Sequence, residues 1–142
     1  AEDGIRDIGV TGVQTCALPI LRRKEIVKQY DESFLEMKNF QPAQIVGRDW
    51  SGHHLYILRI NFSKLDLSRG QLMRELKRNK IGSQVHYIPL PRHPYYRNLG
   101  NIPEQFPAAE DYYAQALSIP LFYGLTDLEQ LRIINTLKEL LA

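Results

Sequence analysis

The chain has 142 residues, one cysteine, and 18 Lys and Arg against 16 Asp and Glu, which leaves a net charge of +2. This length suits one domain with a single core, and so small a net charge excludes the strongly basic balance typical of nucleic-acid binding. No apolar run approaches the roughly 20 residues needed to span a bilayer, so we expect a cytoplasmic protein whose partners include neither nucleic acid nor membrane.

The first 20 residues differ from the rest of the chain. They lack the basic start and apolar run of a signal peptide, and they show neither helical nor strand periodicity. Two stretches of them, AEDGIRD and VTGVQTCALPI, resemble translations of the two constant parts of a sequencing adapter. We therefore expect residues 1–20 to be an artefactual, disordered segment and residues 21–142 to be a natural domain, present as a fragment of a longer protein.

The natural part begins with a helix and a strand. Helical spacing over residues 21–37 predicts an amphipathic helix whose inner face carries Ile26, Tyr30 and Phe34. Residues 53–61 are rich in aromatic and aliphatic side chains and contain neither Pro nor Gly. This run is typical of a strand that is covered on both faces.

A second helix and strand follow. Ser68 and Gln71 form a capping-box pattern at the start of a helix, and Gly82 supplies its predicted end. Residues 83–88 then predict a short strand that Pro89 stops. The next residues, Pro89–Gly100, hold several prolines and predict a constrained, mostly extended loop.

The last third of the sequence predicts two more helices around an extended segment. Pro107 suits the first turn of a helix, and we expect its buried side to carry Ala109, Tyr112, Tyr113 and Ala116. Residues 117–122 are extended. A capping box then begins a terminal helix, in which the predicted inner stripe is Leu128, Leu131, Ile134, Leu137 and Leu141. The order of elements indicates an α+β domain, with a small sheet and helices packed mainly on one face.

The loop after the second strand carries most of the chemically versatile side chains. Aromatic rings can stack on a base or cover a cofactor, and Arg can bind phosphate or carboxylate oxygens through two hydrogen bonds. Tyr and Pro are also common in loops that only cover a core edge, so binding and packing both stay open for this loop. Within and just before it lie His86, Tyr87, Arg92, His93, Tyr95, Tyr96 and Arg97.

The rest of the chain offers no other recognisable chemistry. His53 and His54 are adjacent on a predicted strand, so they point to opposite faces and cannot bind one ion together. We find no spacing typical of metal ligands, and we expect no metal. The acidic residues are scattered on polar helix faces, and no nucleophile or phosphate-binding glycine motif is present.

Two runs carry a resemblance to a known family. They are GSQVHYIPLPRHPYYRNLG, over residues 82–100, and FPAAEDYYAQALSIPLFYGLTDLEQ, over residues 106–130. Both resemble the C-terminal domain of the DegT/StrS family of sugar aminotransferases, and the resemblance covers essentially all of residues 21–142. It implies the small C-terminal domain of a fold-type I aminotransferase.

The resemblance implies an activity and its partners. The cofactor would be pyridoxal 5′-phosphate, bound mainly by an N-terminal domain that this sequence lacks, and the parent enzyme would be a homodimer. The amino donor would be glutamate, and the acceptor would be the 4-keto group of a UDP-linked 6-deoxy-N-acetyl sugar, in a pathway of the pseudaminic acid type. The lysines of this chain lie on polar helix faces or beside loops. None suits a Schiff base, which needs a desolvated amine, so the fragment alone is expected to be inactive.

The same resemblance implies roles for the loop. His86 and Tyr87 would form the wall near the cofactor, and the nucleotide-sugar site would be lined by Arg92, His93, Pro94 and Tyr95. No catalytic residue is expected in this chain.

Two alternatives stay open. One is another nucleotide-sugar aminotransferase of the family, with a 3- or 4-keto acceptor. The other is a non-catalytic nucleotide-binding or interaction module.

Overall fold

The computed structural model of this chain describes residues 4–43 and 46–141. Its strands β1 (Phe40–Pro42), β2 (Tyr56–Ile60) and β3 (Ala116–Ile119) form one antiparallel sheet in the order β1-β2-β3. The predicted α+β class is therefore confirmed. The helices are α1 (Gly4–Phe34), α2 (Arg69–Arg78), α3 (Pro94–Asn98), α4 (Pro107–Gln115) and α5 (Asp127–Leu141).

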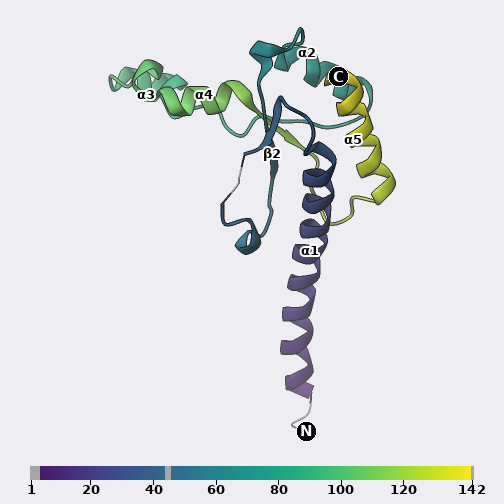
Figure 1. Cartoon of the computed structure of the whole chain (residues 1–142). Helices are drawn as coiled ribbons and strands as arrows, with labels where there is room; N and C mark the ends of the chain where they lie inside the picture. Colours follow the sequence, from purple (N-terminus) through teal and green to yellow (C-terminus); the bar gives the residue numbers. More distant parts are fainter. Residues whose placement is uncertain (1–3, 44–45, 142) are drawn as a thin grey trace.

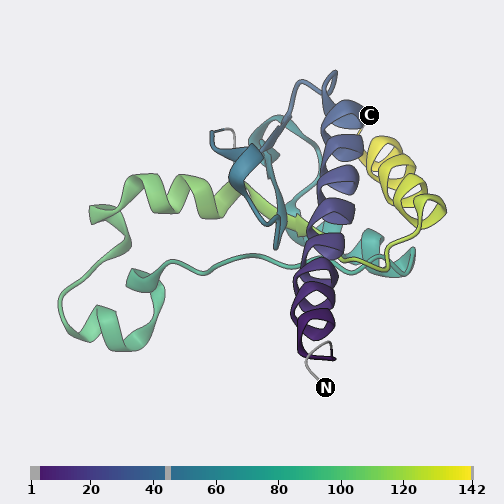
Figure 2. The same cartoon turned by 90° about the horizontal axis from the view of Figure 1, so that it is seen from below.

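The core lies between the sheet and a helical layer. Burial alternates along β2, and its inner positions are Tyr56, Leu58 and Ile60. The α1 and α5 helices pack against each other, and Figures 1 and 2 show them side by side next to the sheet. The prediction that this strand is covered on both faces is wrong, because Ile57 and Arg59 on the other face stay partly exposed. One covered face is the usual arrangement in an antiparallel sheet.

Two buried side chains of the core donate hydrogen bonds to other elements. Tyr30 is fully buried, and its hydroxyl donates to the carbonyl of Pro120 at 2.9 Å. Gln130 of α5 is also fully buried, and its Nε2 donates to the carbonyl of Ile26 in α1 at 2.8 Å. Such pairing offsets the cost of removing these groups from water, and it fixes how α5 sits against α1.

The first helix extends further toward the N-terminus than the sequence indicates. We expected no regular structure in residues 1–20, but α1 runs from Gly4 to Phe34 without a break and includes Pro19. The correction has a physical reason. Residues 21–34 form a helix that packs on the core, and each preceding residue extends this existing helix without a new nucleation cost. Figure 1 shows the first part of α1 projecting beyond the body of the domain.

The second helix ends differently from the prediction. Its capping box is confirmed, since Ser68 Oγ accepts from the Gln71 backbone N–H and the Gln71 side chain accepts from that of Ser68. The helix stops at Arg78, before Gly82, because Lys80 adopts the left-handed conformation with φ of 57°. The predicted strand 83–88 is reduced to one bridge between Gln84 and Ser118.

Residues 87–115, here called the arm, leave the sheet edge and return into β3. Figures 1 and 2 show the arm extending away from the body, with α3 near its tip and α4 leading back. The predicted loop is less extended than expected, because residues 90–92 and α3 are helical. The predicted buried side of α4 is confirmed only in part: Ala116 is buried but belongs to β3, Tyr112 and Tyr113 are half-buried, and Ala109 is exposed, so no residue of α4 itself is buried.

The predicted inner face of the terminal helix α5 is confirmed in part, because Ile134, Leu137 and Leu141 are buried as expected. Its capping box is confirmed, with Thr126 and Glu129 bonding reciprocally. Leu128 and Leu131 are exposed. The buried stripe is rotated slightly about the helix axis from the predicted one and consists of Gln130, Ile133, Ile134, Leu137 and Leu141.

Candidate functional site

The structure separates the predicted site residues into two groups. His86 lies at the sheet edge beside β3, where it lines a cavity of about 330 Å³ with Ser118, Gln84 and Leu55. Arg92, His93, Pro94 and Tyr95 lie further along the arm, and none of them lines that cavity. The loop therefore supplies one group beside the core and another on a projecting element.

His86 is held by the strand next to it. The Gln84 N–H donates to the Ser118 carbonyl at 3.1 Å, and the Ser118 N–H donates to the Gln84 carbonyl at 2.8 Å. This bridge brings the imidazole Nδ1 of His86 to 2.7 Å from the Ser118 hydroxyl. Tyr87 follows directly and is exposed, with its ring edge-on to the His86 ring at 4.7 Å between centroids. One imidazole nitrogen of His86 is thus bonded within the domain.

Arg92 is already paired inside the arm. Its Nε donates to Glu110 Oε2 at 2.9 Å, and its Nη2 donates to the same oxygen at 2.5 Å. Its guanidinium carbon also lies 4.8 Å from the centre of the Tyr113 ring. The carboxylate raises the pKa of Arg92 through these bonds. Since Glu110 takes the Nε side of the guanidinium, only the Nη1 side is open to a phosphate oxygen.

The remaining predicted residues shape the start of α3. His93 is the residue before the helix, Pro94 is its first residue, and the His93 carbonyl accepts from the Arg97 N–H at 3.1 Å. Pro suits this position because the missing N–H would be unbonded there in any case. Tyr95 is 69% exposed and meets the Tyr96 ring edge-on. Such rings offer aromatic surface to a base or to another protein element.

A set of polar contacts holds the root of the arm, and no pattern in the sequence predicts these contacts. Arg69 in the first turn of α2 donates to the backbone carbonyls of Tyr113 and Ala116, and its guanidinium lies over the Tyr113 ring. On the other side, Arg59 of β2 pairs with Asp111 of α4 at 2.9 Å. These contacts fix the direction in which α4 leaves the sheet.

The lysines of the described residues offer no buried amine. Lys24 is the only one of them that is partly buried, and its Nζ donates to the backbone carbonyl of Asp49 at 2.8 Å. The others are exposed, and no lysine lines the cavity at His86. A Schiff-base lysine needs a neutral, desolvated amine, so this part of the chain does not provide one.

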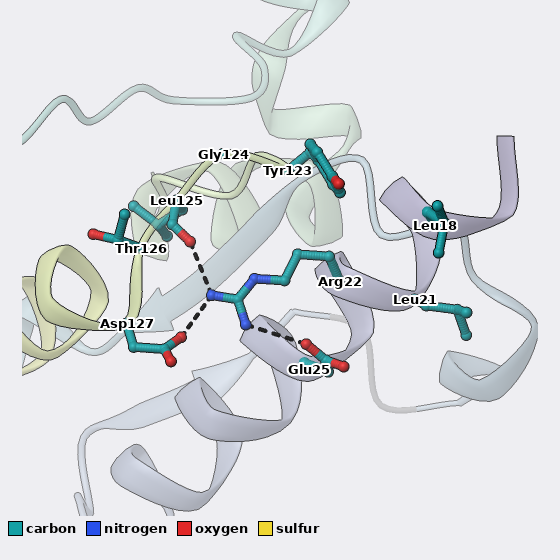
Figure 3. Close-up of a pocket in the computed structure, with 9 residues that line it drawn as sticks. All are labelled: Leu18, Leu21, Arg22, Glu25, Tyr123, Gly124, Leu125, Thr126 and Asp127. Carbon is teal, nitrogen blue, oxygen red and sulfur yellow. Dashed lines mark hydrogen bonds and ion pairs between the residues drawn. The ribbon is translucent and has the colours of Figure 1, made fainter. Parts of the chain in front are cut away.

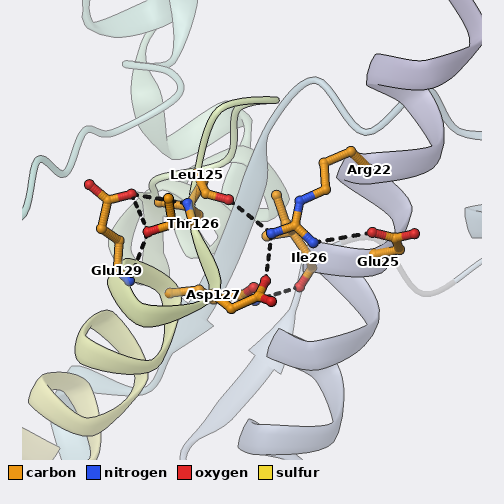
Figure 4. A network of polar contacts seen from close by, with 8 residues as sticks. Arg22, Glu25, Ile26, Leu125, Thr126, Asp127 and Glu129 are labelled. Atoms are coloured by element: carbon orange, nitrogen blue, oxygen red, sulfur yellow. Dashed lines mark hydrogen bonds and ion pairs between the residues drawn. The ribbon is translucent and has the colours of Figure 1, made fainter.

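A larger hollow lies elsewhere, where α1 meets the loop before α5. It has a volume of about 620 Å³ and is lined by Leu18, Leu21, Tyr123 and their neighbours (Figure 3). Arg22 reaches across it and donates to the Leu125 carbonyl at 2.9 Å and to Asp127 at 2.6 Å (Figure 4). The side-chain hydrogen bonds of Arg22 to Asp127 and Glu25 raise the pKa of its guanidinium. Arg22 thus ties the start of α5 to α1, and no predicted site residue is present there.

Two classes of feature are absent from the described part of the chain. Its His, Cys, Asp and Glu side chains form no group of three or more that is able to hold a metal ion. Among the same residues, no helix has both the length and the apolar character that a membrane span requires.

The fold and the site define a small α+β domain that presents a basic, aromatic arm and a histidine-lined cavity, with no buried lysine among its described residues. A model of the DegT/DnrJ/EryC1/StrS aminotransferase family matches residues 7–138. The chain belongs to this family, which confirms the resemblance found in the sequence.

Relatives and solved structures agree with this assignment. An uncharacterised protein of Methanocaldococcus jannaschii is 33% identical over 136 residues, which is 95% of this chain and 35% of that protein. The structure is similar to the apo form of a putative sugar aminotransferase of Streptococcus pneumoniae, with a TM-score of 0.80 and 31% identity over 93% of this chain and 33% of that one. The Helicobacter pylori aminotransferase PseC shares the fold, with a TM-score of 0.80 and 23% identity over 94% of this chain and 35% of that one.

The comparisons also concern the cofactor of similar proteins and the length of this chain relative to theirs. The pneumococcal protein has been solved in a PLP form, at 33% identity and a TM-score of 0.76. This confirms, for neighbours of this domain, the cofactor that the resemblance implied. The chain spans about a third of the length of the relatives it matches.

Proposed function

We propose that residues 21–142 are the C-terminal small domain of a homodimeric, pyridoxal phosphate-dependent sugar aminotransferase. In this proposal an N-terminal domain supplies the cofactor-binding lysine, and the present domain forms one wall of the site. The observation that carries the proposal is the family match over residues 7–138, found in a chain whose described lysines are exposed or bonded to the backbone.

The residues present suit a wall but not a covalent anchor. His86 keeps one ring nitrogen free beside a cavity of about 330 Å³, and Tyr87 offers an exposed ring next to it. We therefore assign both to the cofactor side of the site. Pyridoxal phosphate, when bound, supplies the electron sink for amino-group transfer, and these side chains would orient it and exclude water.

The arm is assigned to the sugar nucleotide. Arg92 has an open Nη1 side, His93 and Pro94 set the start of α3, and Tyr95 is exposed. A guanidinium and aromatic rings are suited to diphosphate oxygens and to a base, respectively. In this proposal the arm sets substrate specificity, while the chemistry takes place on residues outside these 142.

For the substrate, we propose glutamate as donor and the 4-keto group of a UDP-linked 6-deoxy-N-acetyl sugar as acceptor. The motif VHYIPL over 85–90 with HPYYR over 93–97 supports this choice. It resembles the transaminase that forms UDP-4-amino-4,6-dideoxy-N-acetyl-beta-L-altrosamine. PseC is described as acting in pseudaminic acid biosynthesis, but at 23% identity its likeness supports the fold alone.

The test is an assay of the parent enzyme with glutamate and a panel of UDP- and dTDP-linked 3-keto and 4-keto sugars. We expect the highest kcat/KM with the UDP-linked 4-keto substrate. Preference for a 3-keto sugar or another nucleotide would contradict the specificity and favour the alternative within the family. The 142-residue chain, mixed with pyridoxal phosphate, glutamate and the same sugars, is expected to show no turnover.

The origin of residues 1–20 belongs to the same proposal. We propose that they are translated adapter sequence, which predicts that the source DNA encodes something different upstream of Leu21. Sequencing that DNA tests both ideas. A continuous frame with a cofactor-lysine segment would support the aminotransferase. A start codon at Leu21, or a stop codon just before it, would support a free-standing binding module.

A further inference from the structure

A buried serine lies next to His86, and the predicted roles leave it unused. Ser118 is the only polar residue of β3 (sequence ALSI), all of whose residues are buried, and it is 4% exposed. Its backbone N–H and carbonyl are both bonded to Gln84. The hydroxyl therefore remains as a separate polar group, and burying it without a partner would be costly.

The hydrogen bonds of the described residues give this hydroxyl a single partner, Nδ1 of His86 at 2.7 Å. A neutral imidazole has one nitrogen that donates and one that accepts. If Nδ1 carried the proton, it would donate to Ser118 Oγ, and the hydroxyl proton would lack an acceptor among the described residues. If Nδ1 accepts, the hydroxyl proton is satisfied and the imidazole proton sits on Nε2.

We propose that Ser118 is a positioning residue that holds neutral His86 in the Nε2–H form. His86 then presents a hydrogen-bond donor, and the group it recognises is an acceptor oxygen of the cofactor. Two observations support the arrangement: the reciprocal backbone bridge between Gln84 and Ser118 fixes the strand spacing, and both side chains line the same cavity. The cofactor as ligand rests on the proposed function, whereas the tautomer rests on the structure alone.

The tautomer can be measured on the 142-residue chain by long-range ¹H–¹⁵N NMR, with His86→Gln used to assign the His86 ring signals. We expect the Nε2–H form in the unmodified chain and a mixture of tautomers in Ser118→Ala. Ser118→Thr keeps a hydroxyl and should retain the Nε2–H form. Ser83→Ala is the matched control, because Ser83 lines the same cavity and no hydrogen bond links its side chain to His86. An Nδ1–H form, or no change in Ser118→Ala, would overturn the proposal.

The role toward the cofactor is tested on the parent enzyme. Ser118→Ala should weaken pyridoxal phosphate binding about fivefold, the usual scale of one neutral hydrogen bond, and leave KM for the sugar nucleotide unchanged. Ser118→Thr should restore the affinity. Unchanged affinity in Ser118→Ala would refute the positioning role and leave the proposed function standing. A parent that binds no pyridoxal phosphate at all would refute the proposed function, and with it the cofactor-facing role of His86.

Discussion

Replacing Arg69 with Met should loosen the arm without unfolding the domain. Arg69 donates to the carbonyls of Tyr113 and Ala116, the latter at 3.3 Å, and its guanidinium lies 4.6 Å from the centre of the Tyr113 ring. Met keeps much of the aliphatic stem and removes the charge and the donors. Because α4 has no buried residue, little apolar packing remains to hold it in place.

The size of the effect follows from these contacts. A hydrogen bond from a charged donor contributes roughly 1.5–3 kcal/mol, and a cation–π contact at a partly exposed site contributes about 0.5–1 kcal/mol. Partial exposure of Arg69 places the total near the low end, at about 2 kcal/mol. Since about 1.4 kcal/mol corresponds to a factor of ten, the opening of α4 should become about 30-fold more frequent.

Hydrogen exchange of backbone amides in α4 measures this opening directly. We expect exchange in α4 to accelerate by about that factor in Arg69→Met, while amides of β2 and α5 keep their rates. Arg74→Met is the matched control, because Arg74 is exposed on the same helix and carries the same charge. Unchanged exchange of α4 in a folded Arg69→Met protein, or equal effects of the two variants, would refute the role given to Arg69.

Further predictions concern stability and the arm. Burial raises the pKa of Tyr30 well above its ordinary value of 10.0. The neutral Tyr30 hydroxyl therefore contributes fully to stability below pH 10, and this contribution declines as the pH rises above 10. The free energy of unfolding in urea should accordingly fall less between pH 10 and 11 in Tyr30→Phe than in the unmodified chain. Leu137→Ala, at a fully buried site, should cost about 2–5 kcal/mol by the same method, against under about 0.5 kcal/mol for exposed Leu128→Ala. Glu110→Gln should speed solvent exchange of the Arg92 Nε–H, seen by NMR, because the charge of its hydrogen-bond acceptor is lost; unchanged exchange would contradict the pairing.

The fold could be predicted from the sequence where local signals and periodicity agree. The capping boxes at Ser68 and Thr126 are local, and both are present in the structure. The first two turns of the inner face of α5 are predicted wrongly, because leucines at spacings of three and four fit two adjacent stripes that share Ile134, Leu137 and Leu141. Packing against α1 and α2 favours the one that includes Gln130 and leaves Leu128 exposed. Periodicity predicts that a helix has an apolar face, but packing against neighbouring elements determines which residues are buried.

In the candidate site, too, the sequence indicates some residues, whereas the fold determines which partners they contact. Residue types alone drew attention to His86 and Arg92, because a histidine and an arginine in an aromatic loop are chemically conspicuous. Their partners, Ser118 and Glu110, lie 32 and 18 residues away along the chain. Strand register and helix direction bring each pair together. Because local spacing specifies neither, these partners could not be chosen from the sequence.

The arm is an element whose position depends on few contacts. Its α3 and α4 helices contain no buried residue. Even the large apolar side chains of Tyr95 and Leu99 are exposed on the arm. Exposed ion pairs such as Arg59–Asp111 contribute about 0–1 kcal/mol each, so polar contacts at the root supply only a few kcal/mol. A ligand present at 100 times its dissociation constant contributes about 2.7 kcal/mol. A ligand bound to the arm at this level would therefore contribute a free energy comparable to that of the contacts at its root.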